Sequence, residues 1–186
     1  MRIIAGEWSS RRLKTLSGTE TRPTLDKVRG AVFSSLGGFF EGGVMLDLYG
    51  GSGAVALEAL SRGFESAVIC DKSKDAVRII RENVSSLQAQ ERCRILSMED
   101  RKALAVLAGE KAVFDLVYLD PPYAKQHNEE IIRFLYENGM IGRNGRIVVE
   151  CLKEDALPDA CGQIVKYKEA VYGITRIVYY RLEEET

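Results

Sequence analysis

Asp47-Leu48-Tyr49-Gly50-Gly51-Ser52-Gly53 is a glycine-rich segment that follows a short apolar run and precedes residues 54–62, whose apolar side chains have helical spacing. Glycines let the backbone turn sharply and let a ligand approach the main chain where a Cβ would clash. The expected helix adds unpaired amides at its N-terminus. This strand–loop–helix arrangement predicts a nucleotide-like ligand at the carboxyl end of the strand.

Apolar runs and amphipathic stretches alternate after this segment. We expect strands at residues 44–49, 66–70, 93–98, 113–119 and 145–150, and helices at 54–62, 73–87, 100–108 and 129–137. Such alternation predicts an α/β, Rossmann-like, doubly wound sheet that is mostly parallel. The last two strand-like runs, 163–169 and 174–182, have no helix between them, so we expect a hairpin that makes the last strand antiparallel.

The first 43 residues have a different pattern. Two short strand-like pieces surround Gly6 and residues 9–10, and a helix is expected from about residue 25 to 36, so we predict a small β-hairpin/helix extension. Residues 44–186 would form the main domain. Residues 1–29 carry seven basic and three acidic side chains, whereas the remainder carries 19 basic and 24 acidic ones. This asymmetry predicts a local basic surface on a mildly acidic body, unless the clustering is only a solvated surface.

The composition narrows the function classes. A chain of 186 residues that is 46% hydrophobic fits one compact domain with a small appendage. No apolar run reaches the roughly 20 residues that a membrane-spanning helix needs, and the N-terminus has no signal-peptide pattern. Four scattered cysteines and one histidine argue against a zinc site. We therefore expect a cytoplasmic protein without a membrane or metal partner.

Three acids follow successive predicted strands and indicate which nucleotide binds. Asp47 stands four residues before Gly51, where a carboxylate repels pyrophosphate but suits the ammonium group of a methionine moiety. Asp71 ends the second strand and can accept hydrogen bonds from ribose hydroxyls. Asp100, just past the third strand, could face an adenine amine or could simply cap a helix. The predicted cofactor is S-adenosylmethionine, bound by Asp47, Tyr49, Gly50, Gly51, Ser52, Gly53, Asp71, Lys72 and Asp100.

The segment Asp120-Pro121-Pro122-Tyr123 follows the fourth predicted strand, at the same edge of the expected sheet as the cofactor loop. Two prolines fix two φ angles, so the Asp120 carboxylate and the Pro121 carbonyl would form a rigid pair of acceptors. Such a pair can hold the two N–H donors of an exocyclic amine, and Tyr123 offers a ring on which a base can stack. Because a methyl sulfonium is already activated, positioning and electrostatics suffice for transfer. A proline-stiffened turn is the structural alternative.

The glycine segment and the Asp-Pro-Pro-Tyr segment together resemble those of amino-methyltransferases that act on nucleic-acid bases. Several further segments resemble the RsmD family over nearly the whole chain: Arg2–Gly6, Arg11-Arg12-Leu13, Thr21-Arg22-Pro23-Thr24, Val28-Arg29, Gly51-Ser52-Gly53, Leu57–Gly63 and Tyr172-Gly173-x-Thr175-Arg176. The chain departs from the usual family residues at four positions: Tyr49 replaces Phe, Gly50 replaces Ala, Asp71 replaces Glu, and Ser10 replaces Gly.

The resemblance implies transfer of a methyl group from S-adenosylmethionine to N2 of a guanine in 16S ribosomal RNA. The small extension suits a substrate that is already folded, such as an rRNA loop within a small ribosomal subunit. We expect a monomer that contacts RNA through Arg11, Arg12, Arg22, Arg29 and Arg176.

Three alternatives remain. The first is an adenine-N6 methyltransferase on DNA or RNA. The second is an NAD-dependent oxidoreductase, because Gly51-x-Gly53-x-x-Ala56 fits the loose dinucleotide fingerprint. The third is an RNA-binding assembly factor without catalytic activity. An oxidoreductase has no use for the Asp-Pro-Pro-Tyr segment, and intact acceptors and glycines argue against an inactive enzyme.

Overall fold

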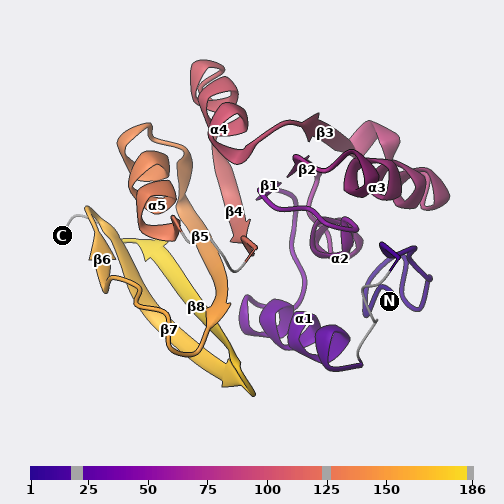
Figure 1. The fold of residues 1–186 in the computed structure, drawn as a ribbon, viewed down its shortest axis with the longest axis horizontal. Coiled ribbons are helices and arrows are strands. Elements are labelled where there is room, and N and C mark those ends of the chain that lie inside the picture. The colour runs from indigo at the N-terminus through magenta and orange to yellow at the C-terminus, as the bar shows by residue number, and fades with distance from the viewer. Residues whose placement is uncertain (18–22, 123–126, 184–186) are drawn as a thin grey trace. The chain divides into compact units, whose positions relative to one another are not determined.

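The computed structural model describes residues 1–17, 23–122 and 127–183 (Figure 1). These residues divide into two compact units. The first unit is Met1–Asp100 and the second is Arg101–Thr186. The division between units follows the third strand, whereas the sequence analysis separates an extension at residue 43. That functional boundary stays a prediction.

Three parallel strands form the sheet of the first unit. They are β1 (Val44–Asp47), β2 (Ser66–Asp71) and β3 (Cys93–Ser97), in the order β3-β2-β1. The register pairs Asp47 with Ile69 and Asp71 with Ser97, so the three carboxyl ends lie at one edge. Helix α2 (Ala54–Ser61) and helix α3 (Lys74–Ser86) connect the strands, and a short 3-10 turn (Gln90–Arg92) precedes β3.

The helices begin and end where the local chemistry predicts. Ser73 caps α3, because its hydroxyl accepts a hydrogen bond from the amide of Ala76. Helix α1 (Pro23–Ser35) ends before Gly37 and Gly38, which both have positive φ values, and the Gly38 amide donates to the carbonyl of Phe33. Two glycines therefore terminate α1 as expected.

Residues 1–16, here called the N-terminal arm, fold as a compact loop. The two strand-like pieces do pair in an antiparallel sense, but only through the isolated bridge between Arg2 and Arg12. The amides of Ile3 and Leu13 bond across this bridge to the carbonyls of Arg11 and Met1. Other amides of the arm bond to α2 and α3 instead. Ser10 has a φ of 67°. This left-handed conformation gives a physical reason for the glycine that usually stands at this position.

The second unit contains helix α4 (Asp100–Gly109) except its first residue, helix α5 (Asn128–Glu137) and the other strands: β4 (Phe114–Leu119), β5 (Ile141–Leu152), β6 (Ala160–Cys161), β7 (Ile164–Tyr172) and β8 (Thr175–Leu182). Their order is β4-β5-β8-β7-β6. Strand β4 is parallel to β5, while β8 is antiparallel to both β5 and β7 (Figure 1). The predicted antiparallel last strand is confirmed.

Three boundaries in this unit differ from the prediction. Strand β5 is 12 residues long and includes Gly142 and Gly145, where the register with β4 shifts. The final hairpin turns at Gly173 and Ile174, because Tyr172 pairs with Thr175. The short strand β6 has no signal in the apolar pattern. Within the described residues, no helix is long and apolar enough to cross a bilayer.

Candidate active site

Three acids lie near one another at the carboxyl ends of β1–β3, as the sequence predicts. Asp47 ends β1, Asp71 ends β2, and Asp100 follows β3 and opens α4. Burial raises the pKa of the Cys70 thiol, and the charges of all three acids raise it further. This pKa is about 12. The edge of the first unit is therefore strongly negative, which suits a cationic ligand.

Asp47 is the most unusual of these acids. Its side chain is 1% exposed, and neither carboxylate oxygen makes a hydrogen bond of normal geometry with the described residues. Burial raises the pKa of Asp47 to about 7, and the Asp71 charge raises it further, although the nearby amides of Tyr49 and Ala56 partly offset this. A buried carboxyl without a partner costs free energy, and it is a group that a bound cation would stabilise.

Asp71 and Asp100 organise the loop itself. One Asp71 oxygen accepts a hydrogen bond from the Gly51 amide at 2.9 Å, and the other accepts one from the Ser73 amide at 2.9 Å. The Tyr49 hydroxyl donates to Asp100 at 2.7 Å. A carboxylate oxygen has two lone pairs, so it can accept more than one hydrogen bond. Binding of ribose by Asp71 and of adenine by Asp100 stays a prediction.

The glycines of the loop have separate structural reasons. Gly51 and Gly53 have φ values of 58° and 81°, which side chains with a Cβ rarely adopt. Gly50 has no such constraint, but a Cβ there would lie 2.5 Å from Cγ2 of Ile69 and 3.0 Å from Cδ1 of Ile80. The two isoleucines fill the space that an alanine would need, which explains the departure from the family at Gly50.

The remaining cofactor candidates lie around the same loop. The Ser52 hydroxyl is 3.5 Å from the sulfur of Met1, and the Ser52 carbonyl accepts a hydrogen bond from Asn83 at 2.8 Å. Lys72 is exposed. Although three carboxylates gather here, the described part of the chain contains no group of three His, Cys, Asp or Glu side chains that could hold a metal ion.

The acceptor segment follows β4 in the second unit. Asp120 is exposed, Pro121 is buried and Pro122 is exposed, while Tyr123 lies outside the described residues. The preceding strand is firmly anchored, since the Tyr118 hydroxyl donates to Glu150 of β5 at 2.9 Å. Burial raises the pKa of Glu150, and the Tyr118 hydrogen bond lowers it by less. A rigid strand therefore carries the Asp120-Pro121 segment.

The predicted RNA-contacting arginines have different environments. Arg12 is exposed, and Arg11 is exposed although one of its nitrogens donates to the Ser86 carbonyl at 2.8 Å. Arg29 is only 5% exposed and its guanidinium binds other parts of the protein. Arg176 donates to the Asp155 carbonyl and lies 3.8 Å from Glu169. Arg22 lies outside the described residues. Arg29 and Arg176 both bond within the protein, and RNA contact by these arginines stays a prediction.

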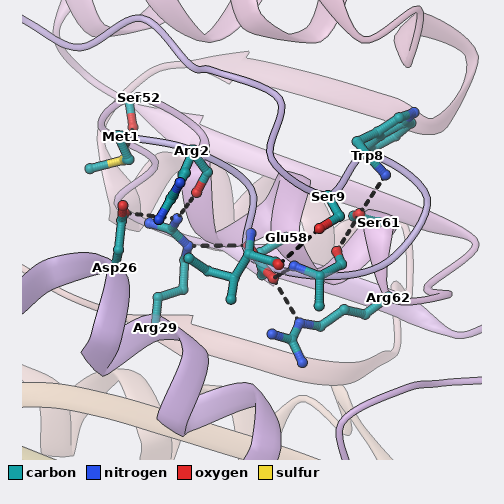
Figure 2. A network of polar contacts seen from close by, with 12 residues as sticks. Met1, Arg2, Trp8, Ser9, Asp26, Arg29, Ser52, Glu58, Ser61 and Arg62 are labelled. Carbon is teal, nitrogen blue, oxygen red and sulfur yellow. Dashed lines mark hydrogen bonds and ion pairs between the residues drawn. The ribbon is translucent and has the colours of Figure 1, made fainter. Parts of the chain in front are cut away.

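Glu58 is a buried acid that holds the N-terminal arm near the glycine loop, and it is not among the predicted site residues. It lies on α2 with its side chain 0% exposed, and each of its oxygens accepts two hydrogen bonds. One oxygen binds the Ile4 amide at 2.8 Å and Nε of Arg29 at 3.4 Å. The other binds the Ala5 amide at 3.1 Å and Nε of Arg62 at 2.7 Å. Figure 2 shows the carboxylate between the two guanidinium groups.

This carboxylate fixes the arm against the helix that begins at the cofactor loop. The fit at that contact is close, because a Cβ at Gly6 would lie 1.8 Å from the Ser61 carbonyl oxygen. The amides of Glu7 and Trp8 also bond to Ser61. The sequence signals were an acid inside the apolar helix AVALEALS and the family-like segment Leu57–Gly63 that contains it.

Asn83 makes a second connection between the arm and the loop. Its side chain is 1% exposed. Its oxygen accepts from the Lys14 amide at 2.8 Å, and its nitrogen donates to the Lys14 carbonyl at 2.9 Å and to the Ser52 carbonyl at 2.8 Å. One buried amide thus holds the backbone of the basic arm and the backbone of the cofactor loop.

Comparison with known proteins agrees with this architecture. The family model described as "Conserved hypothetical protein 95" matches residues 1–181. The "Ribosomal RNA small subunit methyltransferase D" of Escherichia coli (strain K12) is 30% identical over 185 residues, which cover 100% of this chain and 91% of that protein.

Solved structures share the fold. A conserved hypothetical protein from Streptococcus pyogenes is 38% identical with a TM-score of 0.79, covering 84% of this chain and 95% of that one. SMU.776, solved in complex with SAH, is 11% identical with a TM-score of 0.68, covering 85% of this chain and 49% of that one, and shows the fold alone.

Parallel strands with a glycine loop after β1, the Asp120-Pro121 segment after β4 and an antiparallel β8 are the architecture of a Rossmann-like methyltransferase. The match of the family model over residues 1–181 also identifies the family. This chain belongs to the family described as Conserved hypothetical protein 95, the RsmD family of methyltransferases.

Proposed function

We propose that this chain transfers a methyl group from S-adenosylmethionine to the exocyclic N2 of a specific guanine in 16S ribosomal RNA. The observation that carries the proposal is the acid-lined glycine loop. Asp47 is buried and makes no hydrogen bond of normal geometry with the described residues, and it lies with Asp71 and Asp100 beside backbone positions open to a ligand. This environment opposes the pyrophosphate of NAD and favours a cationic sulfonium and ammonium ligand.

The bound donor supplies a methyl group already activated on sulfur. Asp47 and the loop residues would hold this donor, while the carboxylate of Asp120 and the carbonyl of Pro121 would accept hydrogen bonds from the two N–H groups of the target amine. These acceptors would orient the nitrogen lone pair toward the methyl carbon, so that the new N–C bond would form as the S–C bond breaks and S-adenosylhomocysteine leaves. The amine then loses one proton to the exposed Asp120 or to water. Neither step requires a covalent enzyme intermediate.

The substrate assignment rests on family membership and on the basic arm. Arg11 and Arg12 are exposed on an arm whose backbone is held in place by buried side chains, so they can contact phosphates without rearrangement. We propose that residues 1–43 form the RNA-facing extension of a monomeric, cytoplasmic enzyme. A folded rRNA loop within an assembled or assembling small subunit suits so small an extension.

The test is direct identification of the product. Small-subunit particles from cells that lack the enzyme are incubated with donor carrying a labelled methyl group, digested to nucleosides and analysed by mass spectrometry. We expect label in N2-methylguanosine with the wild-type enzyme, a loss of more than tenfold with Asp120→Ala, and no loss with the exposed control Glu154→Ala. Label in N6-methyladenosine, or label only on duplex DNA, would overturn the assignment.

A further inference from the structure

Two arginines on neighbouring strands of the second unit flank one tyrosine ring. Arg146 of β5 and Arg181 of β8 stand directly opposite each other in the antiparallel register. The guanidinium carbons lie 5.6 Å and 5.3 Å from the ring centroid of Tyr167 on β7. Tyr167 is 36% exposed, Arg181 is exposed and Arg146 is half-buried. We call Arg146, Tyr167 and Arg181 the arginine–tyrosine patch.

The positive charge of this patch is not neutralised within the described protein. Like charges directly opposite each other destabilise a pair of strands. Neither guanidinium forms an ion pair with a carboxylate of the described residues, in contrast to Arg133 and Arg176 of the same unit. Arg146 donates only to the nearby carbonyls of Asn144 and Gly145, at 2.7 Å and 3.2 Å. Such an unfavourable arrangement is expected where an anionic partner binds.

The side chains of Arg146 and Arg181 lie on one face of the sheet, because the two residues pair directly across β5 and β8. Successive side chains on a strand point to opposite faces, which places Tyr180 and Arg176 of β8 on the other face. Arg176 is therefore not part of the patch.

The patch is also close to the acceptor segment along the sheet. Arg146 pairs with Leu116 of β4, four residues before Asp120. At about 3.3 Å per strand residue, the separation along the strand is roughly 13 Å. One RNA strand can span this distance, so a nucleotide near the target base could reach the patch.

We propose that the arginine–tyrosine patch is a second RNA-binding surface, which holds the phosphodiester backbone of the substrate near the modified base. Arginine presents a planar fork that matches phosphate oxygens, and the Tyr167 ring fixes the orientation of both forks before binding. An anion between the two guanidinium groups would also remove their mutual repulsion. The proposal deepens the proposed function and rests on it for the identity of the polyanion.

The experiment compares the wild type with Arg146→Ala combined with Arg181→Ala. The matched control is Arg133→Ala combined with Lys102→Ala, which removes two exposed positive charges elsewhere in the same unit. Affinity for a 16S rRNA transcript is measured by filter binding over a range of salt concentrations, and steady-state kinetics use small-subunit particles. S-adenosylmethionine affinity is measured by calorimetry.

We expect the patch variant to raise KM for particles about tenfold or more, with kcat and donor affinity within twofold of the wild type. Loss of two phosphate contacts should reduce the slope of log K against log salt by about 1.4–1.8. If the two arginines had a purely structural role, replacing them would lower Tm. Because the replacement removes the repulsion between like charges, we expect Tm to be unchanged or raised. Arg146→Lys combined with Arg181→Lys keeps the charge and should recover part of the affinity.

Equal transcript affinity and salt slope in the patch variant and the control would overturn the proposal. A raised KM for particles with unchanged transcript affinity would assign the patch to a protein of the subunit instead, and would also overturn it. If the wild type binds the transcript through the patch but methylates no particle, the proposed function fails while the RNA-binding surface stands.

Discussion

At the scale of single residues, Asp47 links stability to pH. Burial raises its folded-state pKa to about 7, whereas the ordinary value is 3.8. Between these values the folded protein holds a proton that the unfolded chain has lost. The free energy of unfolding therefore decreases as pH rises from about 4 to about 7, and this contribution levels off above pH 7. Without a ligand, the folded protein is therefore most stable when Asp47 is protonated and neutral.

Donor binding should show the opposite dependence on pH. If the ionised Asp47 pairs with the donor's ammonium group, affinity for S-adenosylmethionine should rise between pH 6 and pH 8, by about tenfold for a pKa near 7. Asp47→Asn should bind more weakly at pH 8 and should show little of this rise. Asp75→Asn is the control, because Asp75 on α3 is 80% exposed. Calorimetry at three pH values measures the donor affinity of each variant. A wild-type affinity that does not depend on pH would contradict the role of Asp47.

Glu58 is expected to matter for stability. Its removal leaves Arg29 and Arg62 buried without their carboxylate, together with two unpaired amides of the arm. Breaking such a buried pair typically costs about 3–5 kcal/mol, so Glu58→Ala should lower the free energy of unfolding by that amount. The exposed neighbour Glu65→Ala should change it by less than about 0.5 kcal/mol. Urea denaturation measures both, and a small effect of Glu58→Ala would show that the arm docks without it.

At the scale of elements, the sequence predicted the features that follow local rules. Apolar periodicity located the parallel strands and the helices between them, and Gly37-Gly38 predicted the end of α1. The three acids could be expected at one edge because parallel strands end there together. The positive φ of Ser10 is consistent with the glycine usual at that position.

Features that depend on distant partners could not be predicted in this way. Glu58 and Asn83 bond to residues more than 50 positions earlier in the chain, and nothing in their own helices identifies those partners. The arm does fold back on itself as expected, through the antiparallel bridge between Arg2 and Arg12, but its bonds to α2 and α3 could not be predicted. Arg146 and Arg181 meet only through strand register, which a single sequence does not give.

At the scale of the whole chain, the uneven charge predicts where RNA binds. Arg11→Glu combined with Arg12→Glu should abolish methylation of small-subunit particles while donor affinity stays within twofold, because both side chains are exposed on the arm. Arg78→Glu combined with Arg81→Glu makes the same change in charge on the exposed face of α3 and should retain activity. Filter binding and methylation assays check both. If the two variants lose activity equally, only net charge matters and the arm has no specific role.

The network around Glu58 also has a consequence for how the chain is made. Apart from bonds within the arm, the first 16 residues bond to residues that the ribosome synthesises later: Arg29, Ser52, Glu58, Ser61, Glu82, Asn83, Ser86 and Arg92. Translation adds about 5–20 residues per second, so roughly 4–15 s pass between the emergence of the arm and that of Arg92. During this interval Trp8 and the basic side chains are without their partners, on a nascent chain still attached to the particle that contains the proposed substrate.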